Sequence, residues 1–389
     1  MSTAPTMVDA LALATAVVDD LLVATARDTH EAVARRAHGV VRRGVGPTGV
    51  PAEALHRGIA TVVYGAVGLS FRAASAGLSR LAEAGVGPAL EEGPRGRFVN
   101  AAVNGLIGEE LRRERPRLAI EMGVRHRGRD VVLAPEPVAA AFPGATGRLV
   151  VFLHGLCENE DYWRRHRDRV GSTYGESLAR RGWTPVYLRA NTGLPLRENG
   201  VVLASLMQRL VDAWPTEVTR IALVGHSLGG LVLRASSAVV AEGAAPAPWT
   251  RLVSDVVTLG TPHLGSWFAV GADHASRTLA RAPEVAAFGR IIDRQAPGIH
   301  DLIEGLAQDV PPLPHARYRL VTATLTRSPR HPVAQAFGDL LVTPRSAVGR
   351  DRRGTELFPG AEVLHLGRTD HFGLLNHPEV HAALARWLA

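Results

Sequence analysis

The chain has 389 residues, 46% of them hydrophobic and 21% charged, and its formal net charge is +7 at pH 7. These values are ordinary for a globular protein that buries one large core, or one core and a smaller domain. All 44 basic residues are arginines, and they are dispersed with few aromatic residues between them, so the charge does not predict nucleic-acid binding.

A single cysteine, Cys157, excludes an internal disulfide. The amino-terminal stretch has no basic leader, which makes it a poor signal peptide. The best apolar run, residues 59–71 between Arg57 and Arg72, is shorter than the roughly 20 residues of a membrane span. We therefore expect a cytoplasmic protein. A peripheral membrane contact through the amino-terminal helices stays open, because such a run can lie on a membrane surface.

Residues 1–115 are predicted to form an amino-terminal helical region. Apolar and charged residues recur at helical spacing over residues 8–43, 51–84 and 98–113. Breaks fall at residues 47–49 and 85–96, which are rich in glycine and proline. No motif in this region indicates a chemistry, and packing on the domain that follows is its simplest role.

The pattern changes in residues 116–389. Residues 118–125 and 130–133 flank a turn at His126-Arg127-Gly128, which predicts a hairpin. Continuous apolar runs then alternate with helical segments, which predicts a mainly parallel sheet covered by helices on both faces. The expected strands are residues 149–153, 184–188, 221–224, 253–259, 318–324 and, more weakly, 362–366; the expected helices are residues 174–181, 201–214, 230–240 and 378–388.

The interval between the fourth and fifth of these strands is too long for a plain crossover. We expect it to form a helical cap inserted at about residues 262–317, above the site at the end of the sheet.

The most informative motif is Gly225-His226-Ser227-Leu228-Gly229-Gly230, which lies between an apolar run and a helical run. A Gly-x-Ser-x-Gly turn between a strand and a helix holds the serine hydroxyl out of the backbone, where a base can reach it. A glycine-rich turn without chemistry is the alternative, so the rest of the chain must supply a base and an acid.

In this kind of site the order along the chain is serine, acid, histidine. Asp339 follows the strand at 318–324, and His371 follows the last strand, so both occupy loops at carboxyl ends of strands. We predict His371 as the base and Asp339 as the acid that orients it. The competing residues are His365, His377 and His381 for the base, and Asp301 and Asp370 for the acid.

An oxyanion formed at Ser227 needs preset N–H donors. The backbone N–H of Leu228 is one candidate, and that of Leu156, in the loop His154-Gly155-Leu156 after the strand at 149–153, is the other. Cys157 has no Gly-x-Cys-x-Gly context, and we interpret it as a buried thiol without a catalytic role.

Together these motifs, with Leu259-Gly260-Thr261-Pro262-His263-Leu264-Gly265, resemble the α/β-hydrolase superfamily over residues 116–389. More narrowly, they are similar to bacterial lipases and to lipase-like proteins related to the GPI-inositol deacylase group. The resemblance implies an α/β-hydrolase fold, Ser227 as nucleophile, His371 as base, Asp339 as acid, and Leu156 and Leu228 as oxyanion donors. A calcium site and a secretion signal, which are frequent in such lipases, are not evident here.

Three further residues could contact substrate, namely His154, His263 and Asn191, although turn and structural roles explain them as well. The predicted function is hydrolysis of a carboxylic ester, with an ester or lipid substrate, through an acyl-enzyme that needs no metal or organic cofactor. An acyltransferase or thioesterase with the same three residues is one alternative. A non-catalytic binding protein that keeps the fold is another.

Overall fold

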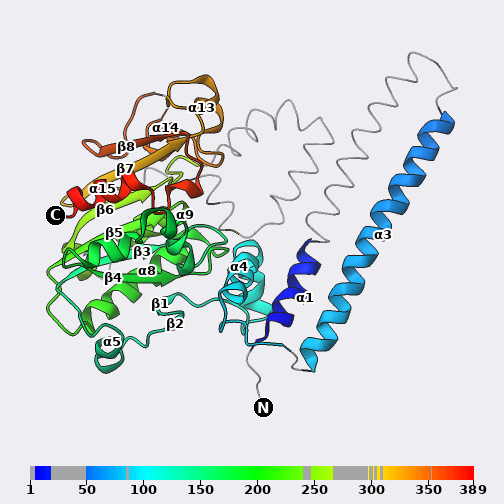
Figure 1. The fold of residues 1–389 in the computed structure, drawn as a ribbon, viewed down its shortest axis with the longest axis horizontal. Coiled ribbons are helices and arrows are strands. Elements are labelled where there is room, and N and C mark those ends of the chain that lie inside the picture. The colour runs from blue at the N-terminus through cyan, green and yellow to red at the C-terminus, as the bar shows by residue number, and fades with distance from the viewer. Residues whose placement is uncertain are drawn as a thin grey trace. The chain divides into compact units, whose positions relative to one another are not determined.

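The computed structural model describes residues 5–18, 50–84, 87–239, 247–265, 297, 301, 305–306, 310–351 and 353–389 (Figure 1). The described residues divide into two compact units, one ending at Val103 and the other beginning at Asn104. Each unit is described by itself.

The first unit is helical. Helix α1 (Met7–Val18) packs along α3 (Val50–Glu83), where the Ser75 hydroxyl donates to the Ala12 carbonyl at 2.9 Å. A third helix, α4 (Pro94–Glu114), begins in this unit, continues into the second and is kinked at Ile107. The helices predicted at 51–84 and 98–113 are thus present, and residues 19–43 of the first predicted helix lie outside the described residues. The domain boundary after residue 115 stays a prediction.

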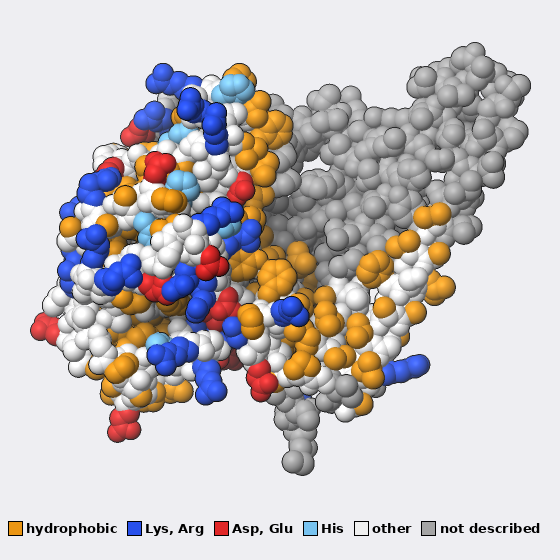
Figure 2. Space-filling model, viewed as in Figure 1, with side chains coloured by type: hydrophobic (Ala, Val, Ile, Leu, Met, Phe, Trp, Pro, Cys, Tyr) orange, Lys and Arg blue, Asp and Glu red, His pale blue; other side chains and the backbone are white. Residues whose placement is uncertain are grey.

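Part of α3 carries apolar side chains on its surface (Figure 2). Val63, Val67, Leu69 and Leu81 are all exposed. Within the described residues, none of the helices combines the length and the apolar character that a membrane crossing requires. The peripheral membrane contact stays a prediction.

The second unit is built on one sheet of eight strands in the order β2-β1-β4-β3-β5-β6-β7-β8. Strands β3 to β8 all run parallel to one another, as predicted. The predicted hairpin is also present, and its first strand pairs antiparallel with β4, which extends the sheet at that edge. The strands are β1 (Gly123–His126), β2 (Arg129–Asp130), β3 (Arg148–Leu153), β4 (Thr184–Arg189), β5 (Arg220–His226), β6 (Val253–Leu259), β7 (Arg317–Thr324) and β8 (Glu362–Gly367).

Helices connect the parallel strands. Helix α8 begins at Leu196, directly after Pro195 and five residues before the predicted start. The other elements of this unit are α5 (Pro135–Ala141), η3 (Glu160–Arg164), α6 (Arg167–Val170), α7 (Tyr174–Ala179), α8 (Leu196–Asp212), α9 (Leu228–Ser237), η4 (Pro248–Leu252), α13 (Pro332–Phe337), α14 (Pro344–Ala347), η5 (Phe372–Leu374) and α15 (Pro378–Trp387).

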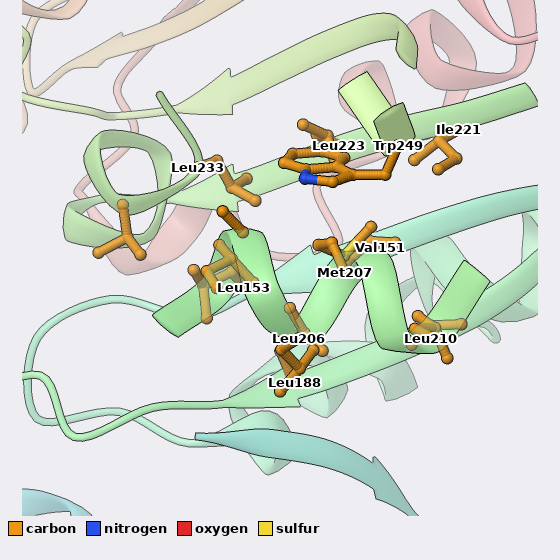
Figure 3. Packing of buried hydrophobic residues seen from close by; sticks show 14 of the residues in the cluster. Val151, Leu153, Leu188, Leu206, Met207, Leu210, Ile221, Leu223, Leu233 and Trp249 are labelled. Carbon is orange, nitrogen blue, oxygen red and sulfur yellow. The ribbon is translucent and has the colours of Figure 1, made fainter. Parts of the chain in front are cut away.

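The sheet has a buried core on each face. Successive side chains of a strand point to opposite faces, so Val151 and Leu153 of β3 join α8 and α9 on one side (Figure 3). Phe152, which lies between them in the sequence, joins α7 and α15 on the other. Burial on both faces explains why these strands are continuous apolar runs rather than alternating ones.

The strand order predicts a binding site at the carboxyl ends of two central strands. The chain runs from β3 outward to β4 and then crosses back to β5, on the other side of β3. The carboxyl ends of β3 and β5 therefore form a topological switch point, where open α/β sheets bind ligands. The loop of His154 and the turn of Ser227 follow these two ends.

The predicted cap interrupts the chain between β6 and β7. A Cβ atom on Gly305 would lie 2.3 Å from the Gly265 backbone nitrogen. Gly265 and Gly305, which lie between β6 and β7 in the sequence, are therefore next to each other in space. Most of the predicted cap at about residues 262–317 lies outside the described residues, and its helical nature stays a prediction.

Candidate active site

Ser227 occupies a strained turn between β5 and α9. Its backbone has φ 52° and ψ −125°, a region that L residues rarely adopt and that costs free energy on the order of 1–3 kcal/mol. The turn also needs its glycines, because a Cβ on Gly225 would lie 2.5 Å from Gly230, and one on Gly229 would lie 2.3 Å from the Leu153 carbonyl. The spacing of the motif thus has a steric cause.

His371 and Asp339 are hydrogen-bonded in the buried interior. His371 Nδ1 lies 2.8 Å from Asp339 Oδ2, and the His371 amide donates to the Asp339 carbonyl at 2.9 Å. The other carboxylate oxygen of Asp339 accepts from the amides of Leu341 (3.0 Å) and Val342 (2.8 Å). Both side chains are at most 2% exposed. The turn after β7 therefore fixes the carboxylate toward one nitrogen of the imidazole.

The second nitrogen of His371 is buried and has no hydrogen-bond partner among the residues that the structure describes. Burial by itself lowers the pKa of His371, but the Asp339 carboxylate outweighs it, and the pKa is raised above its usual value. The ring also packs beside that of His226, with 4.7 Å between centroids, and His226 directly precedes Ser227. The ring of the predicted base therefore lies next to the residue that directly precedes the strained serine turn.

The competing residues have other partners. The Asp301 carboxylate accepts from the Leu196 amide at the start of α8, and exposed Asp370 accepts from the Gly373 amide. His365 bonds to Thr324, while His377 caps α15 and His381 bonds to Ser177. Of the residues weighed from the sequence, the structure thus brings Asp339 and His371 together and places the others elsewhere.

The loop after β3 borders the serine. We call residues Gly155–Glu158 the oxyanion loop. A Cβ on Gly155 would lie 2.9 Å from the Ser227 Cβ, and the Gly155 amide already donates to Glu158 Oε2 at 2.7 Å. The next amide, that of Leu156, is therefore the candidate donor on this loop. The Leu228 amide opens α9, and the first amides of a helix have no partner within it. Both donor assignments stay predictions.

Cys157 has an unusual backbone but an inert thiol. Its φ is 59°, and its amide donates to the Thr192 hydroxyl at 3.1 Å. Burial raises the pKa of the Cys157 thiol to about 12, which leaves it protonated at neutral pH. Because the thiolate is the nucleophilic form, Cys157 is not a rival to Ser227.

The three residues suggested as substrate contacts are buried and bonded within the chain. His154 bonds to the Gly155 carbonyl and accepts from the Ala190 amide, so both of its nitrogens are in use. Asn191 donates to the Gly108 carbonyl and accepts from the Gly193 amide. His263 lies 3.3 Å from the Thr258 hydroxyl, and burial lowers its pKa well below the usual value. His263 Nδ1, however, has no hydrogen-bond partner among the described residues, and the three substrate contacts stay predictions.

Sequence reasoning missed Glu158 and His226. Glu158, 3% exposed, accepts from the Gly155 amide and lies 3.0 Å from His226 Nδ1. A weak signal was present, since Glu158 and Glu160 follow an apolar strand within a few residues of each other. Glu160 instead pairs with Arg125 and Arg189. In the part of the chain that the structure describes, no group of three or more His, Cys, Asp or Glu side chains is arranged to hold a metal ion.

Residues 145–275 match the protein family described as “Putative serine esterase (DUF676)”. This range includes the oxyanion loop and Ser227 and ends before Asp339 and His371. A triacylglycerol lipase of Burkholderia plantarii is 31% identical over 153 residues, which are 36% of this chain and 37% of the lipase. This chain contains an α/β-hydrolase domain similar to serine esterases and lipases. It spans little more than a third of the length of that curated relative.

Solved structures with a similar arrangement include lipases. A Bacillus licheniformis lipase in its propeptide form is 19% identical with a TM-score of 0.45, over 63% of this chain and 51% of that one. A Staphylococcus hyicus lipase is 12% identical with a TM-score of 0.41, over 62% of this chain and 95% of that one. The α/β-hydrolase assignment rests on the sheet order and the family match rather than on these likenesses.

Proposed function

We propose that this chain is a serine hydrolase that cleaves carboxylic esters through an acyl-enzyme on Ser227. The observation that carries the proposal is the Asp339–His371 hydrogen bond, which leaves Nε2 of a ring that packs beside His226, the residue before the strained Ser227, without a partner among the described residues. The match to a serine esterase family supports the same chemistry for the segment that holds Ser227.

In the first half-reaction Ser227 Oγ attacks the ester carbonyl carbon and its proton passes to His371 Nε2. Asp339 stabilises the imidazolium that forms. The backbone amides of Leu156 and Leu228 would donate to the oxyanion. When the tetrahedral intermediate collapses, the C–O bond to the alcohol breaks, and His371 returns its proton to the leaving oxygen.

In the second half-reaction water takes the place of the alcohol. His371 removes a proton from the water as it attacks the acyl-enzyme, and the intermediate releases the carboxylic acid. Ser227 recovers its proton from His371. These steps use only groups of the chain and the substrate. A thioester could enter the first half-reaction in the same way, and another alcohol could replace water in the second.

The test is turnover of p-nitrophenyl esters from short to long acyl chains by the wild type and by Ser227→Ala. We expect kcat to fall by about 10⁴-fold or more in the variant. Ser237→Ala is a matched control on α9, where the hydroxyl donates to the Arg234 carbonyl, and it should retain turnover. Full turnover by Ser227→Ala would refute the proposal. Acyl transfer to an added alcohol in preference to water would change hydrolase to transferase.

A further inference from the structure

Glu158 connects two parts of the site that are far apart in the sequence. Its Oε2 atom accepts from the Gly155 amide at 2.7 Å and lies 3.0 Å from His226 Nδ1. The backbone closes the same loop, because the Glu158 amide donates to the Gly155 carbonyl at 3.2 Å. One buried carboxylate thus joins the oxyanion loop to the last residue of β5, directly before Ser227.

His226 continues the connection to the base. Its side chain is fully buried, and its second nitrogen, Nε2, lies 3.2 Å from the backbone carbonyl of His371. Glu158 and His226 therefore link three segments around the site: the oxyanion loop, the serine turn and the loop that carries His371.

The partners of His226 define its protonation. A neutral imidazole has one donor and one acceptor nitrogen, whereas an imidazolium has two donors. A carboxylate and a backbone carbonyl can only accept, so both contacts are hydrogen bonds only when both nitrogens of His226 carry a proton. Burial alone raises the pKa of Glu158, but His226 outweighs this effect and the pKa is lowered, which keeps the carboxylate ionised.

His154 provides the contrast within the same site. It is also fully buried, but it faces one acceptor, the Gly155 carbonyl at 2.9 Å, and one donor, the Ala190 amide at 3.1 Å. This set fits a neutral ring protonated at Nδ1. Burial lowers the pKa of His154, in agreement with the neutral form.

We propose that Glu158 and His226 form a buried carboxylate–imidazolium pair that positions the oxyanion loop and the His371 loop around Ser227. Both are positioning residues, because they act through Gly155 and through the His371 backbone. The pair also has an electrostatic consequence. An unpaired carboxylate beside the oxyanion loop would oppose the negative charge of the transition state, and the imidazolium cancels it. This role rests on the proposed ester hydrolysis, whereas the charge of the pair does not.

The first experiment measures the charge alone. We would record ring N–H signals of the full chain labelled with ¹⁵N-histidine, at about pH 8, where an exposed histidine is neutral. His226→Asn and His154→Asn assign the two residues by the signals they remove. We expect two ring N–H groups for His226 and one for His154. A single ring N–H on His226 would overturn the pair, whatever the activity of the protein.

The second experiment measures positioning. Glu158→Gln keeps the size of the side chain and an oxygen for the Gly155 amide, but removes the charge. We expect one ring N–H of His226 to disappear and kcat on a p-nitrophenyl ester to fall by about 10- to 100-fold, with KM within about twofold. We expect kcat to fall while KM stays nearly constant, because the pair positions the oxyanion loop and the His371 loop, which act on the transition state.

Glu160→Gln is the matched control, since Glu160 is a buried carboxylate two residues away whose partners are Arg125 and Arg189. It should leave kcat of the folded protein and the His226 signals unchanged. Equal losses of kcat in both variants, or no loss in Glu158→Gln, would refute the positioning role. Wild-type protein with two ring N–H groups on His226 but no turnover of any ester would refute the proposed function and leave the ion pair standing.

Discussion

The two ends of the parallel strands hold buried carboxylates in different ways. Near the amino end of β6, Asp255 is fully buried, and its oxygens contact Ser254, Arg220, Arg317 and Arg319. Burial alone raises the pKa of Asp255, but Ser254 and the arginines outweigh it and the pKa is lowered. Beyond the carboxyl end of β7, Asp339 has one titratable partner, His371, whose far nitrogen is unpaired.

The comparison indicates that the Asp255 carboxylate stabilises the fold, whereas the Asp339 carboxylate is arranged to act through His371. At the amino end both carboxylate oxygens of Asp255 have cationic partners, so this carboxylate is held in ion pairs. At the carboxyl end the chain retains strain at Ser227 and an unpaired buried nitrogen, both of which cost stability. We therefore expect substitutions at the two ends to separate stability from catalysis.

The largest effect is expected from Asp339→Asn. The amide oxygen can still accept from Leu341 and Val342, but the NH₂ group then faces His371 Nδ1 and favours a proton on Nε2, so the ring cannot accept one from Ser227. We predict a fall in kcat of about 10⁴-fold, measured on a p-nitrophenyl ester. Urea unfolding should show a much smaller change. A loss below tenfold would remove Asp339 from the site.

Asp255→Asn should lower the stability of the protein and leave kcat nearly unchanged. Removing one partner of a buried ion pair costs about 3–5 kcal/mol, because the other charge is left buried without its partner. Here that charge is the guanidinium of Arg319, whose side chain is buried. We expect the free energy of unfolding to fall by this amount in urea titrations. The kcat of the folded fraction should stay near the wild-type value, and a selective loss of kcat would contradict the comparison.

A smaller effect is expected where α4 meets the oxyanion loop. A Cβ on Gly105 would lie 2.4 Å from Cys157 Sγ and 2.9 Å from the Cys157 backbone nitrogen. Gly105→Ala should therefore cost about 1–3 kcal/mol of stability and lower kcat, because the neighbouring Leu156 amide moves.

Gly77→Ala on α3 is the matched control for that variant, since among the described residues no atom outside its own stretch of helix lies within 4 Å of the added Cβ. It should raise stability by roughly 0.5–1 kcal/mol and leave kcat unchanged. Both variants can be compared by thermal unfolding and ester turnover. A Gly105→Ala protein as active and stable as the wild type would show that α4 does not constrain this loop.

The smallest expected effect is a shift in pH dependence. The raised pKa of His371 predicts that kcat/KM falls as the pH drops through that pKa, because the imidazolium cannot accept the Ser227 proton. The acid limb should thus lie above the usual value for histidine, about 6.5. In Asp339→Asn the residual activity should show this limb at lower pH. If the acid limb of kcat/KM lies at the same pH in Asp339→Asn as in the wild type, it reports the titration of a group other than His371.

Local patterns were enough to predict much of the fold. The runs of Val, Ile and Leu in β3 to β7 reflect burial on both faces, and this cause acts within each strand. The Gly-x-Ser-x-Gly motif was recognisable because the close approach of Gly225 to Gly230 lies within the motif itself. Features that depend on neighbouring residues leave a local pattern in the sequence, and such features could be predicted.

The features that were missed depend on long-range contacts. Glu158 and His226 are 68 residues apart, and the position of Glu158 after an apolar strand does not indicate which residue it pairs with. The early start of α8 goes with the burial of Leu196 and Asn199 in its first turn, which depends on the rest of the domain. The pairing of β1 with β4 likewise joins segments that are distant in the chain. Such contacts follow only from the assembled sheet.

The adjacency of Gly265 and Gly305 has a consequence for how this protein can diversify. Because the two ends of the intervening segment meet at one point, its length can change without displacing β6 or β7. The entropic cost of closing a loop grows slowly, by roughly 0.6 kcal/mol for each doubling of its length. The chain thus has a position at which selection, or an engineer, can exchange a whole segment while the catalytic framework stays intact.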